Sequence, residues 1–259
     1  METYKLPAQW LGQPLKVAVL GCGGTGYYIG TNLFMLQRVL HSLYEGAGFE
    51  SIDLYDAKGI SEPNLARTGY LSYEIGMNKA VILAHRLNSA LGCETFNAYS
   101  ENATAQKLLD NRYDLIITAT DSLSSRTMVT DLSPRKHTMW LDTGVDKATA
   151  SFVLGDLSSN KSRLPNSRDL FPNTKALQSH KETSCDMQTS LSRQAFGINQ
   201  QVAGHAINLI SQLLMDGEIG YHGGLIDLKD GRTSPIKIDD EVWQSFGYDA
   251  SVAGLLRQG

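Results

Sequence analysis

The stretch KVAVLGCGGTGYYIG, residues 16–30, decides how the chain folds. It opens with an aliphatic and β-branched run over residues 17–21, which predicts a buried parallel strand. The glycines that end this run are Gly21, Gly23, Gly24 and Gly26. Apolar residues then recur at spacings of four and three, which predicts an amphipathic helix. These residues are Ile29, Leu33, Leu36, Leu40 and Leu43.

Glycines between a strand and a helix favour a nucleotide site. They let the backbone turn tightly and bring its N–H groups against phosphate, while the helix that starts there adds its positive end. A glycine-rich turn that serves only packing is the structural alternative. The motif alone does not identify the nucleotide.

The rest of the chain continues the alternation of strands and helices. Further strands are predicted over residues 51–56, 94–100 and 113–121, with a helix over 77–91. The strands at 138–145 and 148–157 are separated by a short turn, so we expect them to be antiparallel. The predicted fold is α/β and Rossmann-like, a mainly parallel open sheet flanked by helices, with antiparallel strands in the C-terminal half.

Beyond this region the chain becomes less regular. Residues 158–183 are polar and interrupted by prolines, which predicts a long loop. A helix is predicted over 197–214, and strand-like pieces between 218 and 238 surround a turn at 229–232.

Composition excludes several classes of protein. The net charge of −4 over 259 residues gives no basic surface for nucleic acid or anionic lipid. No apolar run approaches the roughly 20 residues of a membrane span, and the N-terminus lacks the pattern of a signal peptide, so we expect a cytoplasmic protein. Three widely spaced cysteines without a CxxC pair indicate reduced thiols and no structural zinc.

Charged residues after the strands narrow the choice of nucleotide. Asp56 ends the second strand, where a dinucleotide enzyme would bind ribose, so an NAD(P)-dependent oxidoreductase is one hypothesis. However, Asn64, Arg67 and Lys79 follow it, and Asp121 ends the fourth strand, five residues before Arg126. Cations that neutralise phosphates, together with a carboxylate that can hold Mg²⁺, favour a triphosphate with a metal ion.

The order of these motifs resembles a known superfamily. GxGGxG, Asp56, NLAR, GMNKA and TATDS occur in the order of the ThiF, MoeB and ubiquitin-activating proteins. The resemblance covers residues 16–145 and, more loosely, the helix at 197–214. The phrases GTNLFMLQRVLHSLYEGAG and GISEPNLARTGYLSYEIGMNKAVILAHRLN are most similar to the ThiF-related proteins of the PRTRC plasmid cassette.

The resemblance implies an enzyme that adenylates the C-terminal glycine of a small ubiquitin-like or sulfur-carrier protein with ATP and Mg²⁺. It implies a homodimer of single ThiF-type domains over 1–259: an arm (1–15), a nucleotide-binding half (16–145), and a crossover loop with a partner-binding half (146–259). The implied roles of the site residues are ribose binding by Asp56, phosphate binding by Asn64, Arg67 and Lys79, and Mg²⁺ binding by Asp121.

Each of these residues has a structural alternative. Asp56 or Asn64 can order a turn, and Arg67 or Lys79 can be a solvated surface charge. Asp121 can be a helix N-cap ahead of the SLSSR segment, and the cap does not exclude metal binding.

The cysteines divide into two groups. Cys185 precedes the late helix, where relatives carry a cysteine that attacks the adenylate or takes part in sulfur transfer, and His180 and Lys181 lie close in sequence. A polar loop without chemistry is the alternative. Cys22 and Cys93 are interpreted as small packing residues.

The chain also departs from the family pattern. Ser122 stands where relatives have asparagine, Thr68 where they have glutamine, and residues 1–15 contain no arginine. A non-catalytic relative that binds nucleotide or a partner tail is therefore a third hypothesis.

Overall fold

The structure, a computed structural model, describes residues 2–249 except 45, 135, 158–163 and 173–193. Eight of its strands form one sheet in the order β10-β9-β7-β6-β5-β2-β3-β4. The parallel half comprises β2 (Leu15–Leu20), β3 (Phe49–Tyr55), β4 (Phe96–Tyr99), β5 (Leu115–Thr118) and β6 (Met139–Val145). The strands β7 (Thr149–Asp156), β9 (Tyr221–Asp227) and β10 (Arg232–Lys237) extend it in antiparallel fashion. The predicted fold class is confirmed.

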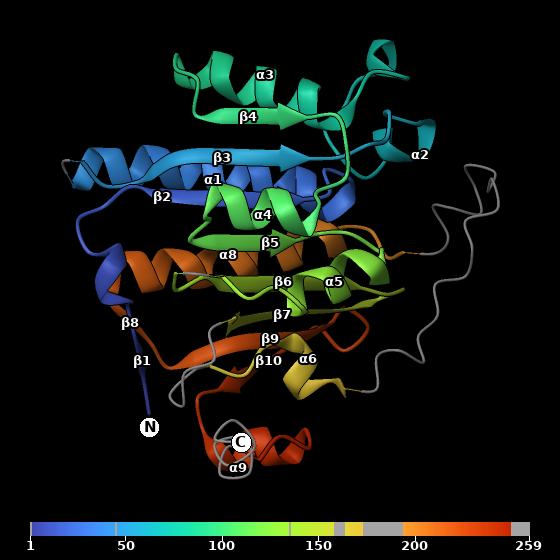
Figure 1. Cartoon of the computed structure of the whole chain (residues 1–259). Helices are drawn as coiled ribbons and strands as arrows, with labels where there is room; N and C mark the ends of the chain where they lie inside the picture. Colours follow the sequence, from blue (N-terminus) through green and yellow to red (C-terminus); the bar gives the residue numbers. More distant parts are fainter. Residues whose placement is uncertain (1, 45, 135, 158–163, 173–193, 250–259) are drawn as a thin grey trace.

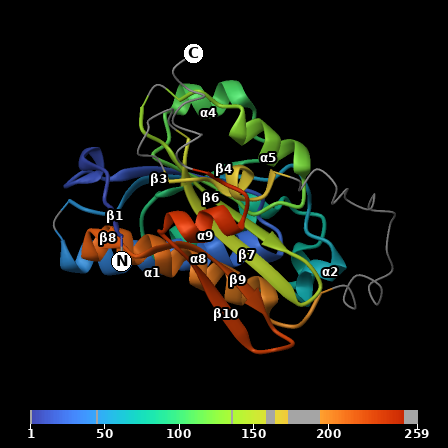
Figure 2. The ribbon, with the colours of Figure 1, turned by 90° about the horizontal axis from the view of Figure 1, so that it is seen from below.

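Helices cover both faces of the sheet (Figures 1 and 2). One face carries α1 (Gly24–Leu43), α3 (Lys79–Leu91) and α8 (Ile198–Asp216), which bury a large apolar cluster against the strands. The other face carries α4 (Ala105–Asn111) and α5 (Leu123–Thr130), which enclose a smaller cluster around Trp140. The chain therefore leaves β2 and β5 toward opposite faces, and this switch point is where open α/β sheets bind ligands.

Several predicted boundaries agree with the observed elements. The helix predicted over 77–91 begins at Lys79, because the Asn78 side chain caps it by accepting from the N–H groups of Ala80 and Val81. The predicted turn at 229–232 joins β9 to β10. Most of the loop predicted over 158–183 lies outside the described residues, although α6 (Ser167–Leu170) falls within it.

The remaining elements are short. They are β1 (Tyr4–Lys5), the 3-10 helices η1 (Ala8–Trp10) and η2 (Ser72–Glu74), α2 (Glu62–Leu65), β8 (Glu218–Ile219) and α9 (Asp240–Ser245). The pairing of β1 with β8 attaches the N-terminal arm to the end of α8. Among the described residues, no helix is both long and apolar enough to cross a bilayer.

A buried histidine holds α9 against the sheet. The Nε1–H of Trp243 donates to Nε2 of His222 (2.8 Å), and the opposite ring nitrogen lies 2.8 Å from the carbonyl oxygen of Leu154. Because an indole only donates, His222 Nε2 must accept, and Nδ1 must carry the proton toward Leu154. Burial lowers the pKa of His222 to about 4, so the ring is neutral in the folded protein at neutral pH.

This histidine gives a pH-dependent prediction. The folded pKa lies below the unfolded value of about 6.5, so only the unfolded chain takes up a proton as the pH falls from 6.5 to 4. We expect His222 to remove about 3 kcal/mol from the free energy of unfolding over this range. Denaturant titrations of wild type and His222→Gln at both pH values measure the difference, since glutamine does not titrate. An equal acid-induced loss in both proteins would assign the effect to other groups.

Candidate nucleotide-binding site

The glycine loop joins β2 to α1 under tight steric limits. A Cβ atom on Gly26 would lie 1.9 Å from the carbonyl oxygen of Gly21, so the first turn of α1 presses directly on the loop. Gly21 has φ +100°, and its Cβ would lie 2.7 Å from the carbonyl oxygen of Ala119. At three of the four predicted glycines, Gly21, Gly24 and Gly26, a side chain would approach a neighbouring atom too closely. A Cβ on Gly23 would meet nothing within 4 Å.

The start of α1 is open to an anion. Gly23 occupies the N-cap position, where no side chain accepts from the helix, and the first turn holds no acidic residue. The first N–H groups of a helix need such acceptors and carry partial positive charge. A phosphate group is a suitable acceptor at this position.

The late helix α8 completes the loop from the other side. The Thr25 hydroxyl donates to Oδ1 of Asn199 (2.8 Å), and a Cβ on Gly24 would lie 2.9 Å from the same amide. Gly24 therefore leaves room for the amide of Asn199, 175 residues away in sequence. This asparagine was not predicted as a site residue, because its only signal was its position in the helix predicted over 197–214.

Asp56 lies directly against the glycine loop. One carboxylate oxygen accepts from the N–H of Cys22 and the other from the N–H of Lys58, both at 2.8 Å. Asp56 therefore orders the turn through its side chain, which is the structural role considered for it above. Asp56 stays a predicted ribose ligand, because each carboxylate oxygen can accept a second hydrogen bond.

Lys79, a largely buried residue, brings a positive charge to the loop. The residue is only 8% exposed, and its charge acts on the Cys22 thiol within the loop. Burial and the Asp56 carboxylate raise the pKa of that thiol, while Lys79 opposes the rise. Among the described residues, no carboxylate or hydrogen-bond acceptor pairs with the Lys79 ammonium. Most of the Lys79 side chain is thus packed against the protein, while its ammonium stays available to an anion, and Lys79 stays a predicted phosphate ligand.

Asn64 and Arg67 lie on the segment that precedes α3. Oδ1 of Asn64 accepts from both the N–H and the hydroxyl of Ser61, each at 3.0 Å, which closes a capping box on α2. The turn role considered for Asn64 is thus present. Arg67 is half-buried, and its backbone N–H donates to the carbonyl oxygen of Asn64. Both residues stay predicted phosphate ligands.

Asp121 lies beyond the end of β5, in the segment that borders the glycine loop. It is exposed, and no hydrogen bond or ion pair among the described residues engages its carboxylate. The N-cap of α5 is Ser122, whose hydroxyl accepts from the N–H of Ser125, so the N-cap alternative for Asp121 is wrong.

Among the described residues, Asp121 could hold Mg²⁺ only as a single carboxylate ligand. The described residues contain no cluster of three or more histidine, cysteine or acidic side chains that could hold a metal. Mg²⁺ commonly binds through one or two carboxylates, with phosphate oxygens and water completing the coordination. A single free carboxylate beside a phosphate loop fits that pattern.

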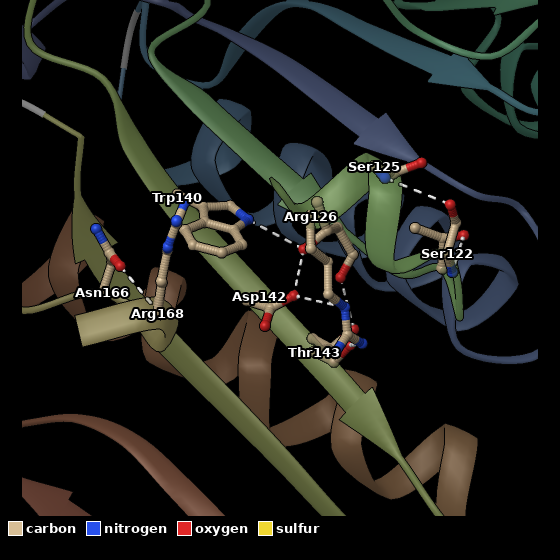
Figure 3. A network of polar contacts seen from close by, with 10 residues as sticks. Ser122, Ser125, Arg126, Trp140, Asp142, Thr143, Asn166 and Arg168 are labelled. Carbon is tan, nitrogen blue, oxygen red and sulfur yellow. Dashed lines mark hydrogen bonds and ion pairs between the residues drawn. The ribbon is translucent and has the colours of Figure 1, made fainter. Parts of the chain in front are cut away.

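Arg126 is anchored beside the site by a buried network (Figure 3). Its Nη2 donates to the carbonyl oxygen of Thr143 (2.7 Å), and its Nε lies 3.3 Å from Oδ1 of Asp142. The same carboxylate oxygen accepts from the Thr118 hydroxyl (2.5 Å), which in turn accepts from the Nε1–H of Trp140 (3.0 Å). Asp142 carries no sequence motif, so only the structure identifies this network.

The three cysteines have different positions. Cys22 is fully buried, as predicted, but Cys93 is exposed, so its interpretation as a packing residue is wrong. The reason is that Cys93 lies in the turn between α3 and β4, outside both elements. Cys185 lies outside the described residues.

Comparisons with known proteins identify the family and the fold of the chain. A family model described as "ThiF family" matches residues 13–234. The protein is 25% identical over 128 residues to the ATP-dependent ubiquitin transferase-like protein Cap2 of Vibrio cholerae. That alignment covers 46% of this chain and only 21% of Cap2.

Solved structures share the fold. PaaA superposes with a TM-score of 0.60 at 16% identity, covering 89% of this chain and 65% of PaaA. MccB of E. coli, solved with ATP, gives 0.59 at 15% identity and coverages of 86% and 64%. MccB with MccA-N7isoASN gives 0.61 at 16% identity and coverages of 89% and 65%. Because the family model spans most of the sequence, the chain belongs to the ThiF family.

Proposed function

We propose that the protein uses ATP and Mg²⁺ to adenylate the C-terminal carboxylate of a small ubiquitin-like or sulfur-carrier protein. The single observation that carries the proposal is the position of Lys79, a largely buried residue whose ammonium lies beside the glycine loop without an anionic partner among the described residues. A nicotinamide site needs no such charge at this position. The names of relatives support the choice: Cap2 is an ATP-dependent ubiquitin transferase-like protein, and MccB has been solved with ATP and with MccA.

In the proposed displacement reaction, each site residue has a separate role. The free N–H groups of α1 and the ammonium of Lys79 bind phosphate oxygens and offset their charge. Asp56 binds the ribose, and Asn64 and Arg67 add phosphate contacts from the α2 segment. The carboxylate of the partner can then approach the α-phosphorus atom, forming an acyl-adenylate and releasing pyrophosphate.

Magnesium would be held by Asp121. When bound, the ion shields the phosphate charges and stabilises the leaving pyrophosphate. Metal binding would break no existing contact of the Asp121 side chain with the described residues.

Three further parts of the proposal rest on the family resemblance. In a second step the Cys185 thiolate attacks the acyl carbon of the adenylate, so that a thioester bond forms and AMP leaves with the broken acyl–oxygen bond. The protein acts as a homodimer of single domains, divided at residues 15 and 145 as given above. It belongs with the PRTRC-type members of the family.

Pyrophosphate exchange into ATP tests the proposal. We expect Mg²⁺-dependent exchange in the presence of a ubiquitin-like protein that ends in glycine, and a loss of roughly 100-fold or more in Asp121→Ala. Asp131→Ala is the matched control, because this aspartate pairs with Arg168 at the far end of α5. Saturable ATP binding without exchange by any such partner would instead identify a non-catalytic relative.

A further inference from the structure

The Tyr70 side chain connects the two halves of the phosphate site. Its hydroxyl donates to the carbonyl oxygen of Cys22 in the glycine loop (3.0 Å) and to that of Lys79 at the start of α3 (3.1 Å). One proton is thus shared between two acceptors from elements 57 residues apart in sequence. Nothing in the sequence motifs pointed to this tyrosine.

The phenol ring is held rigidly in place. Tyr70 is only 3% exposed, and its ring packs edge-on against Tyr27 of α1 at a centroid distance of 4.9 Å. Its backbone N–H donates to the Thr68 hydroxyl (3.3 Å). Burial raises the pKa of Tyr70, so the hydroxyl keeps its proton at every physiological pH.

The position of Lys79 makes this bridge functionally relevant. Lys79 is the first residue of α3, so the bond to its carbonyl oxygen fixes the backbone that carries the ammonium. Cys22 lies between Gly21 and Gly23, so the bond to its carbonyl oxygen fixes the loop whose end starts α1. The bridge therefore sets the separation between the two groups that the proposed function assigns to phosphate binding.

We propose that Tyr70 is a positioning residue whose hydroxyl holds the glycine loop and Lys79 at the spacing of a bound polyphosphate. This inference rests on the proposed function and adds a residue that touches no nucleotide. Pre-organised groups bind more tightly, because less conformational freedom is lost when the ligand arrives. Removal of the hydroxyl should therefore weaken binding of ATP although it removes none of the phosphate-binding groups.

The test compares two buried tyrosines. Tyr70→Phe removes the bridge, whereas Tyr55→Phe removes a hydroxyl that bonds Tyr113 (2.9 Å) on the opposite face of the sheet. We expect the Kd for ATP to rise about ten-fold in Tyr70→Phe, with the Kd of Tyr55→Phe within about two-fold of wild type. The free energy of unfolding of both variants measures how much stability is lost with each buried hydroxyl.

A second measurement does not depend on ATP. Hydrogen exchange of the amides at residues 22–26 and 79–81 should accelerate in Tyr70→Phe and stay unchanged in Tyr55→Phe. If wild type fails to bind ATP, the proposed function is wrong and amide exchange alone decides the bridge. Unchanged exchange at these amides in Tyr70→Phe overturns the inference, as does an equal loss of ATP affinity in both variants.

Discussion

Gly26→Ala should lower the free energy of unfolding by about 3 kcal/mol or more and abolish nucleotide binding. The new Cβ would sit 1.9 Å from the carbonyl oxygen of Gly21, and both atoms belong to backbone that cannot swing aside. Either α1 must move away from β2, or the loop must abandon its turn. Both responses displace the helix N-terminus that faces the predicted phosphate.

Gly23→Ala is the matched control for this substitution. Its Cβ would meet nothing within 4 Å, and its φ of −78° is outside the left-handed region, so it should lose far less stability than Gly26→Ala. Denaturant unfolding of the three proteins measures the comparison. Equal stability of Gly26→Ala and Gly23→Ala would show that the loop tolerates a side chain where the structure leaves no room.

Lys79→Met should separate binding from stability. Loss of charge-assisted hydrogen bonds to phosphate should weaken ATP binding by about 100-fold. The same change should leave the unfolding temperature of the ligand-free protein close to that of wild type, because the Lys79 ammonium makes no hydrogen bond or ion pair with the described residues. Calorimetry of ATP binding and of thermal unfolding measures both effects.

Lys16→Met is the control for the lost lysine. Lys16 lies at the opposite end of β2, where it pairs with Glu50 (3.1 Å), and its side chain is 39% exposed. Its removal should leave ATP affinity unchanged. A stability loss in Lys79→Met together with unchanged ATP affinity would mean that this ammonium serves only the fold.

The strand, glycine turn and helix at the start of the sheet were predictable because their signals are local. The run over residues 17–21, the glycines and the apolar spacing in α1 lie within one segment, so the sequence specifies strand, turn and helix without tertiary information. The order of later strands followed from the same alternation. The short turn before residue 148 was sufficient to predict the antiparallel pair β6 and β7.

Contacts between distant segments could not be predicted in this way. The bond from Thr25 to Asn199, the pairing of β1 with β8 and the bridge from Tyr70 each join residues whose separation in sequence carries no periodic signal. Short helices such as α4 and α5 offer too few turns for a clear apolar pattern. The candidate site residues were predicted from the order of the motifs, whereas the contacts around them depend on packing.

The contacts of Arg126 also could not be predicted from the sequence. A lone arginine in sequence is most simply a surface charge, but here Asp142 and the carbonyl oxygen of Thr143 hold it in place. Asp142 lies in the middle of β6 as part of an ordinary strand sequence. Only the register of β6 against β5, which places it opposite Thr118, brings the network together.

Nucleotide competition tests the central claim most directly. A fluorescent ATP analogue should bind the wild-type protein with Mg²⁺ and should be displaced by ATP, whereas NAD and NADP at the same concentration should leave it bound. Displacement by NAD or NADP at lower concentrations than ATP, with equal strength in wild type and Lys79→Met, would contradict a triphosphate site and identify a dinucleotide-binding protein.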